Sequence, residues 1–286
     1  MANLKEIRNR IASIGSTMQI TSAMKMVSAA KLKKAQDAIV QMRPYSNKLT
    51  ELLQNLSATL DAEDGGVLAS QREVNKVLLV AITSNRGLCG GFNSAVIKDI
   101  KNIVETKYSD KDVSLLTIGK KGDDLLAKEF NIYANKNEVF DDLTFENVAV
   151  IAEDLMSQFT EGKFDRIEIV YNQFKNAATQ ILTEEQFLPI VPPSSEDANT
   201  VDYIFEPSKK EIVEGLIPKS LKTQLFKAIR DSYAAEHGAR MTAMHKATDN
   251  ATELRDELLL IYNKARQASI TNEILEIVGG AEALKG

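Results

Sequence analysis

The residues best suited to chemistry in this sequence form the glycine-rich segment Asn85–Asn93. It follows the apolar run Val77–Ile82, which is typical of a strand buried on both faces, and it precedes an expected helix. Turns of this kind hold phosphates in nucleotide-binding proteins, because their glycines let a ligand approach the backbone. The segment matches neither the dinucleotide nor the P-loop pattern, and it has no lysine placed to hold a phosphate. We therefore interpret Gly87, Gly90 and Gly91 as a structural turn.

The other candidates for chemistry are the single cysteine and the two histidines. Cys89 lies near the start of an expected helix, where a thiol can be activated, but both histidines lie far along the sequence. His237 and His245 would lie roughly 12 Å apart along a helix, too far to share one metal ion. One cysteine also excludes an intrachain disulfide and a cysteine-based zinc site. Since no paired carboxylates or Ser-His-Asp spacing stand out, we predict no catalytic residue, no cofactor site and no metal site.

The glycine-rich segment belongs to a middle region in which strands and helices alternate. We expect strands at 77–82, 113–118, 165–172 and 179–188, and helices at 92–107, 121–130 and 145–159, the last capped by Thr144. Strands that alternate with helices favour a mainly parallel sheet. The predicted fold class is therefore α/β, with a central Rossmann-like α/β domain at 70–207 that contains a loop at 192–197 and follows a linker at 61–66.

Long helices are expected at both ends of the chain. The first extends from about residue 3 to residue 42, and Pro44 either limits it or bends it. The last begins near Pro218 and ends at Gly279-Gly280. The two helices are predicted to pair as a long antiparallel coiled-coil shaft, at 1–60 and 208–286. A repeat of apolar residues every 3.5 positions supports the coiled coil, with Leu4, Ile7, Ile11, Ile14 and Met18 as its first members.

Small residues predict where the two helices approach each other closely. Ser28 and Ala29 would face Ala235 and Gly238, so that residues whose numbers add to 266 or so lie opposite one another. In this register the last turns of the second helix extend past the start of the first. Their apolar side chains would have no partner within the chain and would need a sleeve from another protein. These residues are Ile270, Ile274, Leu275, Ile277 and Val278.

The charge of the chain is uneven. The net charge is −5 at pH 7, yet the first 48 residues are strongly basic. A basic arm suits nucleic acid, anionic lipid or acidic protein loops. No aromatic residues are interleaved for base stacking, so we predict no nucleic-acid binding. The absence of a long apolar run predicts no transmembrane segment, and the start of the chain lacks the apolar core of a signal peptide. Since Cys89 is the only cysteine, a reducing, cytoplasmic location is the default expectation.

Three segments resemble signatures of one family. Gln19–Leu32 resembles the N-terminal signature of the F-type ATP synthase gamma subunit, and Arg86–Asn93 resembles its central motif. Its C-terminal signature is resembled by Tyr262–Thr271 together with Glu273, Glu276–Val278 and Gly280-Ala281. The segments occur in the right order across the whole chain, which makes the combination specific. Position 85 is Asn where the family commonly has Asp. No cysteine-pair insertion is present, so thiol regulation of the chloroplast kind is not expected.

The resemblance implies a rotor. In this family the coiled coil stands inside a ring of alternating α and β subunits, and the α/β domain contacts the epsilon subunit and the membrane-embedded c-ring. The chain would then be a non-catalytic central-stalk subunit, present as a single copy in a hetero-oligomer, that couples ion flow through the membrane sector to ATP synthesis and hydrolysis in the ring. Such a protein of the bacterial type would be peripheral, at the cytoplasmic face of the cell inner membrane.

The matching motifs also imply partner contacts. Met24 and Lys25 should meet acidic loops of the β subunits, and Arg266, Gln267 and Thr271 should touch the inner sleeve of the ring. Two other interpretations stay open: a scaffold or adaptor coiled coil with an α/β head, and an α/β protein that binds a small molecule at the 87–91 turn. Co-purification with a large ATPase complex would distinguish the first, and nucleotide titration of the isolated chain the second.

Overall fold

The computed structural model describes residues 4–57, 67–190 and 209–283. The chain divides into two compact units, one from residues 1–28 and 241–286 and the other from 29–240. The division falls inside both long helices, α1 (Leu4–Ser57) and α5 (Lys209–Ala283), rather than at their ends. The predicted linker at 61–66 and loop at 192–197 lie outside the described residues.

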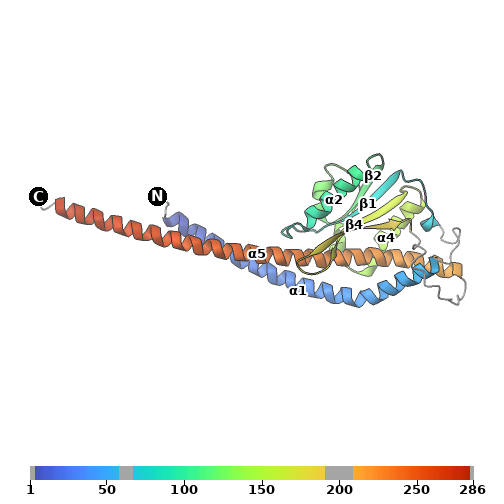
Figure 1. Ribbon diagram of the computed structural model, residues 1–286, viewed down its shortest axis with the longest axis horizontal. Coiled ribbons are helices and arrows are strands. Elements are labelled where there is room, and N and C mark those ends of the chain that lie inside the picture. The colour runs from blue at the N-terminus through green and yellow to red at the C-terminus, as the bar shows by residue number, and fades with distance from the viewer. Residues whose placement is uncertain (1–3, 58–66, 191–208, 284–286) are drawn as a thin grey trace. The chain divides into compact units, whose positions relative to one another are not determined.

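A five-stranded sheet forms the centre of the 29–240 unit (Figure 1). Its order is β3-β2-β1-β4-β5, and every pairing is parallel except that of β4 with β5. The prediction of a mainly parallel sheet is therefore confirmed. The strands are β1 (Lys76–Ile82), β2 (Asp112–Ile118), β3 (Asn131–Asn135), β4 (Arg166–Phe174) and β5 (Gln180–Leu188).

Successive residues of β1 point to opposite faces of the sheet, and both faces are covered. Leu79 packs with apolar residues of α2 (Phe92–Thr106), whereas Leu78 packs with those of α4 (Phe145–Thr160) and α5. This explains why β1 reads as a continuous apolar run. The remaining helices are short: α3 (Lys120–Leu126) and the 3-10 helices η1 (Val67–Ala69) and η2 (Asn137–Phe140).

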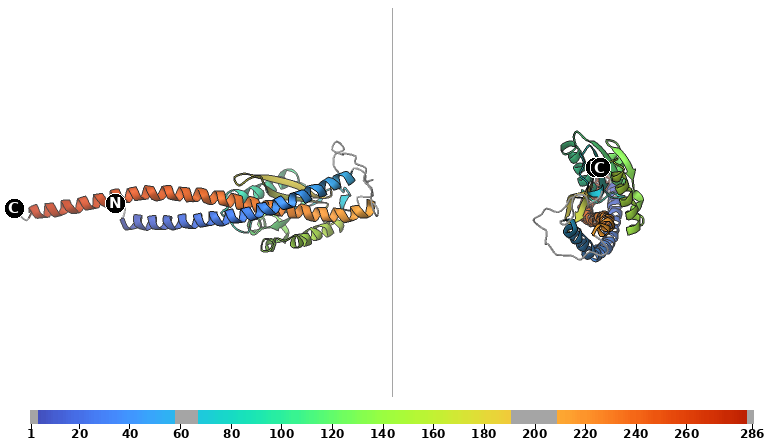
Figure 2. Two further views of the ribbon diagram at one scale, coloured as in Figure 1. Left: turned by 90° about the horizontal axis from the view of Figure 1, so that it is seen from below. Right: turned by 90° about the vertical axis from the view of Figure 1, so that its right-hand side faces the viewer.

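The first part of α5 is a core element of the α/β unit. Leu221, Leu225 and Ile229 are buried in the same cluster as Leu78 and Phe159. Figure 2 shows this orange part of α5 against the sheet, with α1 beside it. The sequence pattern had placed these residues in the shaft, because the small and apolar spacing of a coiled coil equally suits a helix that packs on a sheet.

Several predicted helix ends are wrong. α1 continues through Pro44, and α5 begins before Pro218 and continues through both terminal glycines. Buried Ile217 and Leu221 flank Pro218, so packing on the sheet outweighs the cost of a proline inside the helix. In the middle region α3 is shorter than predicted, and β3, an edge strand with no fully buried residue, was missed.

In the unit formed by residues up to 28 and from 241, α1 and α5 run antiparallel as predicted. Thr21 Oγ1 lies 2.8 Å from Thr248 Oγ1, and the Thr252 hydroxyl donates to Met18 Sδ at 3.3 Å. The partner of each α1 residue therefore lies about three residues further along α5 than the small-residue clusters suggested, nearly one helical turn. Part-buried hydroxyls that bond at a seam position favour one register over its neighbours.

Candidate functional site

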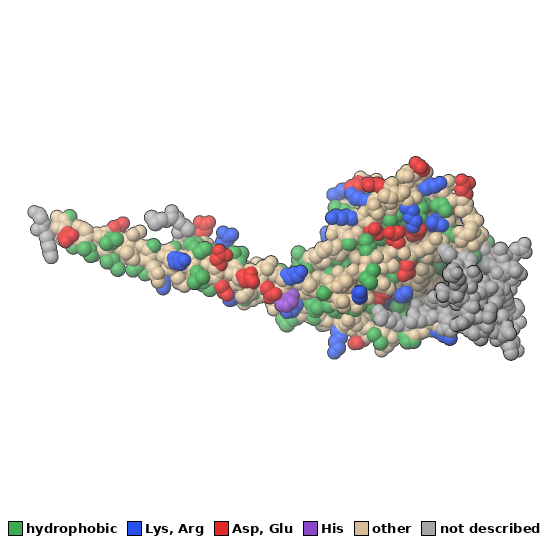
Figure 3. Space-filling view, in the orientation of Figure 1, with side chains coloured by type: hydrophobic (Ala, Val, Ile, Leu, Met, Phe, Trp, Pro, Cys, Tyr) green, Lys and Arg blue, Asp and Glu red, His purple; other side chains and the backbone are tan. Residues whose placement is uncertain are grey.

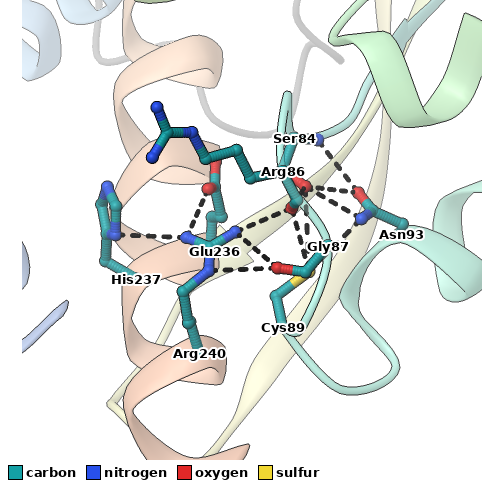
Figure 4. Close-up of polar contacts among 8 residues, drawn as sticks. All are labelled: Ser84, Arg86, Gly87, Cys89, Asn93, Glu236, His237 and Arg240. Atoms are coloured by element: carbon teal, nitrogen blue, oxygen red, sulfur yellow. Dashed lines mark hydrogen bonds and ion pairs between the residues drawn. The ribbon is translucent and has the colours of Figure 1, made fainter. Parts of the chain in front are cut away.

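The glycine-rich loop between β1 and α2 is closed by Asn93, the second residue of α2. The Ser84 N–H donates to Asn93 Oδ1 at 2.9 Å, and Asn93 Nδ2 donates to Ser84 Oγ at 2.9 Å. Asn93 Nδ2 also lies 3.3 Å from Cys89 Sγ, and Ser84 Oγ donates to the Arg86 carbonyl at 2.7 Å (Figure 4). These bonds satisfy the polar groups that the end of β1 would otherwise bury unpaired.

Two residues of the loop adopt left-handed backbone conformations. Gly90 has φ 60°, which suits a glycine, but Leu88 has φ 61° and is 64% exposed. A bulky residue in this region costs conformational energy and persists only where its surroundings hold it. A Cβ at Gly87 would meet nothing within 4 Å, so of these glycines Gly90 is the one that the backbone requires.

The loop is bound to α5 through Arg240. Its Nη2 donates to the Arg86 carbonyl at 2.8 Å and, with Nε, to the Gly87 carbonyl at 3.3 Å (Figure 4). Its Nη1 pairs with Glu236 Oε1 at 2.6 Å, and both side chains are buried. A phosphate needs N–H donors, whereas this loop turns two carbonyls toward a cation. The geometry therefore gives no support to a phosphate site at Arg86–Gly87.

Burial sets the protonation of the groups around Arg240. It lowers the pKa of His237 to about 3, with further lowering by Arg240 and Lys31, so this imidazole is neutral near pH 7. Burial also raises the pKa of the Glu236 carboxyl, and the charge of Arg240 acts against that rise. The pKa of the Cys89 thiol is likewise raised by burial, which confirms the interpretation of Cys89 as a buried thiol rather than an activated nucleophile.

The described residues contain no cluster of three His, Cys, Asp or Glu side chains able to hold a metal ion. Over the same ranges, no helix combines the length and the apolar character needed to span a membrane.

The predicted partner contacts lie in the unit of residues 1–28 and 241–286. Met24 and Lys25 are half-buried on α1, and Arg266, Gln267 and Thr271 are exposed on α5. The Thr271 hydroxyl donates to the Gln267 carbonyl at 2.9 Å, one turn earlier. These side chains are thus presented on the surfaces of two helices, and their contacts with other subunits stay a prediction.

The residues predicted for close helix packing have different surroundings. Ser28 and Ala235 are buried and Ala29 is half-buried. Gly238, however, faces the turn between β4 and β5: an added Cβ would lie 3.2 Å from the Cα and the carbonyl oxygen of Ala177. The small size of Gly238 therefore admits this turn, which corrects the expectation that it admits the first helix.

The last turns of α5 carry apolar side chains that no described residue covers. Figure 3 shows hydrophobic side chains, in green, along this part of the helix. These turns of α5 extend past the residues that pair with α1, as predicted. Their exposed fractions are 47% for Ile270, 54% for Ile274, 63% for Leu275, 72% for Ile277 and 53% for Val278.

Sequence reasoning missed Arg240, Glu236 and Leu88. The signal for the pair was available, since an acidic and a basic residue four apart lie on one helix face. Which loop the guanidinium meets depends on how α5 crosses the sheet, and the spacing alone does not give that. Nothing in the sequence marks the left-handed backbone of Leu88.

Comparison with known proteins identifies the family. The ATP synthase family model matches residues 3–284. The chain is also 71% identical over 287 residues to the ATP synthase gamma chain of Flavobacterium johnsoniae, with both chains covered in full. The chain belongs to the ATP synthase gamma-chain family. The gamma chain of Christiangramia forsetii is 67% identical, again over the full length of both chains. The resemblance stated from the three signature segments is confirmed.

Chains in solved structures of ATP synthases share the fold of this chain. A chain of the Euglena gracilis mitochondrial ATP synthase, in rotational state 3, has a TM-score of 0.73 at 24% identity and covers 98% of this chain and 94% of its own length. A chain of the Tetrahymena thermophila central stalk and c-ring has a TM-score of 0.60 at 24% identity, over 80% of this chain and 99% of its own. At these identities the likeness concerns the fold.

Proposed function

We propose that this gamma chain is the rotor subunit in the central stalk of an F-type ATP synthase. One copy stands inside a ring of α and β subunits and couples ion flow through the membrane sector to ATP synthesis and hydrolysis in that ring. The chain itself carries out no catalysis and binds no cofactor. Family membership and the presence of two long helices and an α/β unit support this role.

The uncovered apolar end of α5 is the observation that carries the proposal. Free in water, a helix with side chains such as Ile274 and Ile277 more than half exposed favours association with another apolar surface. The same turns present Arg266, Gln267 and Thr271 beside these apolar residues. A smooth apolar sleeve lacks the directional hydrogen bonds that would lock one angle, so a ring of this kind can hold the tip while allowing it to turn.

Lys25 and Met24 supply the second contact. Lys25 lies on α1, whose first part carries a strong excess of positive charge, and in the proposal it faces acidic loops of the β subunits. Opposite charges at such a contact favour particular rotor angles, since each β subunit meets the basic side of the shaft in turn. A ligand or rotor shifts a conformational equilibrium only through contacts that differ between the states. The asymmetric pair of helices provides that difference.

The α/β unit is the proposed attachment to the membrane sector. There it meets the epsilon subunit and the c-ring, which places the chain at the cytoplasmic face of the cell inner membrane as a peripheral protein. Rotation of the c-ring would turn the α/β unit, and α5, whose first part lies in the core of that unit, would carry the rotation into the shaft.

Assembly tests the proposal. The chain should co-purify with the α and β subunits of the same organism at one copy per ring, and the complex should hydrolyse ATP. A chain that is folded by circular dichroism but stays monomeric in the presence of those subunits would contradict the proposal. Titration with nucleotides provides the companion measurement, because tight binding to the isolated chain would favour the small-molecule interpretation instead.

A further inference from the structure

Arg240 binds the glycine-rich loop to α5 through a buried guanidinium. The group donates to two successive carbonyls, those of Arg86 and Gly87, at 2.8 and 3.3 Å. A planar guanidinium has its donors in a rigid arrangement, so acceptors bound to it are held in a defined orientation. Rotation of α5 about its own axis would carry the guanidinium away from both carbonyls.

Glu236 fixes the guanidinium from one turn earlier on α5. Its Oε1 lies 2.6 Å from Arg240 Nη1, and the pair is almost entirely buried. The positive charges of Lys31 and Arg86 also favour the ionised carboxylate. Loss of either partner would leave a charge buried without compensation, so each holds the other in place.

The other contacts that α5 makes with the α/β unit are apolar or involve less buried polar side chains. Leu221, Leu225 and Ile229 pack in an apolar cluster, and apolar packing is non-directional. Gln224 and Arg230 add polar contacts, to Gln186 and Leu143 among others, but these two side chains are half-buried. Arg230 also donates from a guanidinium to a carbonyl, but the Arg240 guanidinium is more deeply buried and bonds two successive carbonyls. These charge-assisted bonds are stronger and more directional than apolar packing. The Arg240 contact is therefore the one best suited to resist twisting.

We propose that Arg240, held by Glu236, is a torsional lock between α5 and the loop that follows β1. It positions the helix so that a twist applied to the α/β unit passes into α5 rather than being lost as slip between helix and sheet. The lock lies at the end of the 29–240 unit, since the boundary between the two compact units follows Arg240. The inference rests on the proposed rotor function, because only a rotor must carry torque along this helix.

Hydrogen exchange in the full-length isolated chain tests the contact. Arg240→Gln should raise amide exchange in residues 84–91 by about tenfold, as expected for the loss of hydrogen bonds to a buried charged group. Arg240→Lys keeps the charge and should show a smaller rise. Lys246→Gln removes an exposed positive charge from the same helix and should leave the loop unchanged. Equal protection of the loop in all of these proteins would overturn the lock.

Rotation in the assembled complex tests the torsional role. With a probe on the α/β unit, Arg240→Gln should widen the angular fluctuations of that unit while ATP hydrolysis persists, and Arg240→Lys should restore part of the stiffness. If the angular fluctuations stay unchanged while amide exchange in the loop rises, the Arg240 contact is structural only and the inference is overturned. Failure of the wild-type chain to assemble would instead contradict the proposed function. The hydrogen-exchange experiment would still show whether Arg240 holds the loop against α5.

Discussion

His237 is a buried imidazole whose protonation opposes folding. Its pKa is lowered to about 3 in the folded chain from an ordinary value of 6.5, and its Nε2 has no hydrogen-bond partner among the described residues. The unfolded chain therefore binds a proton below pH 6.5 that the folded chain does not bind until about pH 3. Stability attributable to this group is complete above pH 6.5 and falls as the pH is lowered through this window.

Replacement of His237 should remove that dependence. Between pH 7 and pH 5 the free energy of unfolding of the wild type should fall by about 2 kcal/mol more than that of His237→Phe. His245→Gln, an exposed site on the same helix, is the control and should behave as the wild type. Urea denaturation at the two pH values measures the difference, and parallel losses in wild type and His237→Phe would contradict the account.

Lys25 tests the proposed contact with acidic loops. Lys25→Glu replaces attraction by repulsion, which costs up to several kcal/mol at a close contact. ATP-driven ion pumping should fall severalfold, whereas Lys33→Glu, an exposed lysine further along α1, should change pumping little. Pumping at the wild-type rate in Lys25→Glu would refute the assignment.

The fit of α5 against the sheet depends on Gly238. A Cβ there would lie 3.2 Å from the backbone of Ala177, which must move to accommodate it. We expect Gly238→Ala to lower the free energy of unfolding by about 1–3 kcal/mol.

Gly215 is the matched control for Gly238, since it lies in the same helix and an added Cβ would meet nothing within 4 Å. Gly215→Ala should stabilise the chain by about 0.5–1 kcal/mol, through helix propensity alone. Chemical denaturation of both variants gives the comparison, and equal effects at the two positions would show that the contact with Ala177 is not close.

The sequence predicted most of the elements because their patterns have local causes. The apolar run of β1, the Thr144 cap and the turn after β1 all follow from residue type and spacing, and the structure contains each of them; the Thr144 hydroxyl accepts from the Asn147 N–H. The helix ends were less predictable. Pro44 and Pro218 stop an isolated helix, but tertiary packing decides whether a helix continues through them.

The candidate site was predictable only in part. The turn and the exposed end of α5 could be located from glycines and apolar residues, whereas the role of Gly238 could not. Small residues on a helix show that something approaches closely without showing what approaches. Here the β4–β5 turn approaches, and it is more than sixty residues away in sequence, so local pattern carries no trace of it.

Removal of the end of α5 should weaken assembly with the ring while leaving the folding of the chain almost unchanged. The chain truncated after Thr271 loses residues whose described side chains are exposed, so the free energy of unfolding should change by less than about 0.5 kcal/mol. Its affinity for the ring should fall, because the lost apolar surface is the part that the sleeve would cover. Gly279→Ala is the control, since it keeps that surface. Complete failure to assemble would show that the tip does more than position the shaft.

Rotation of the assembled chain tests the central claim most directly. A probe attached to a cysteine introduced at the exposed Lys111, in a Cys89→Ser background, would report the angle of the α/β unit relative to an immobilised ring. We predict that added ATP drives continuous rotation of the probe in one direction. A probe that stays stationary while the ring hydrolyses ATP at its full rate would contradict the account.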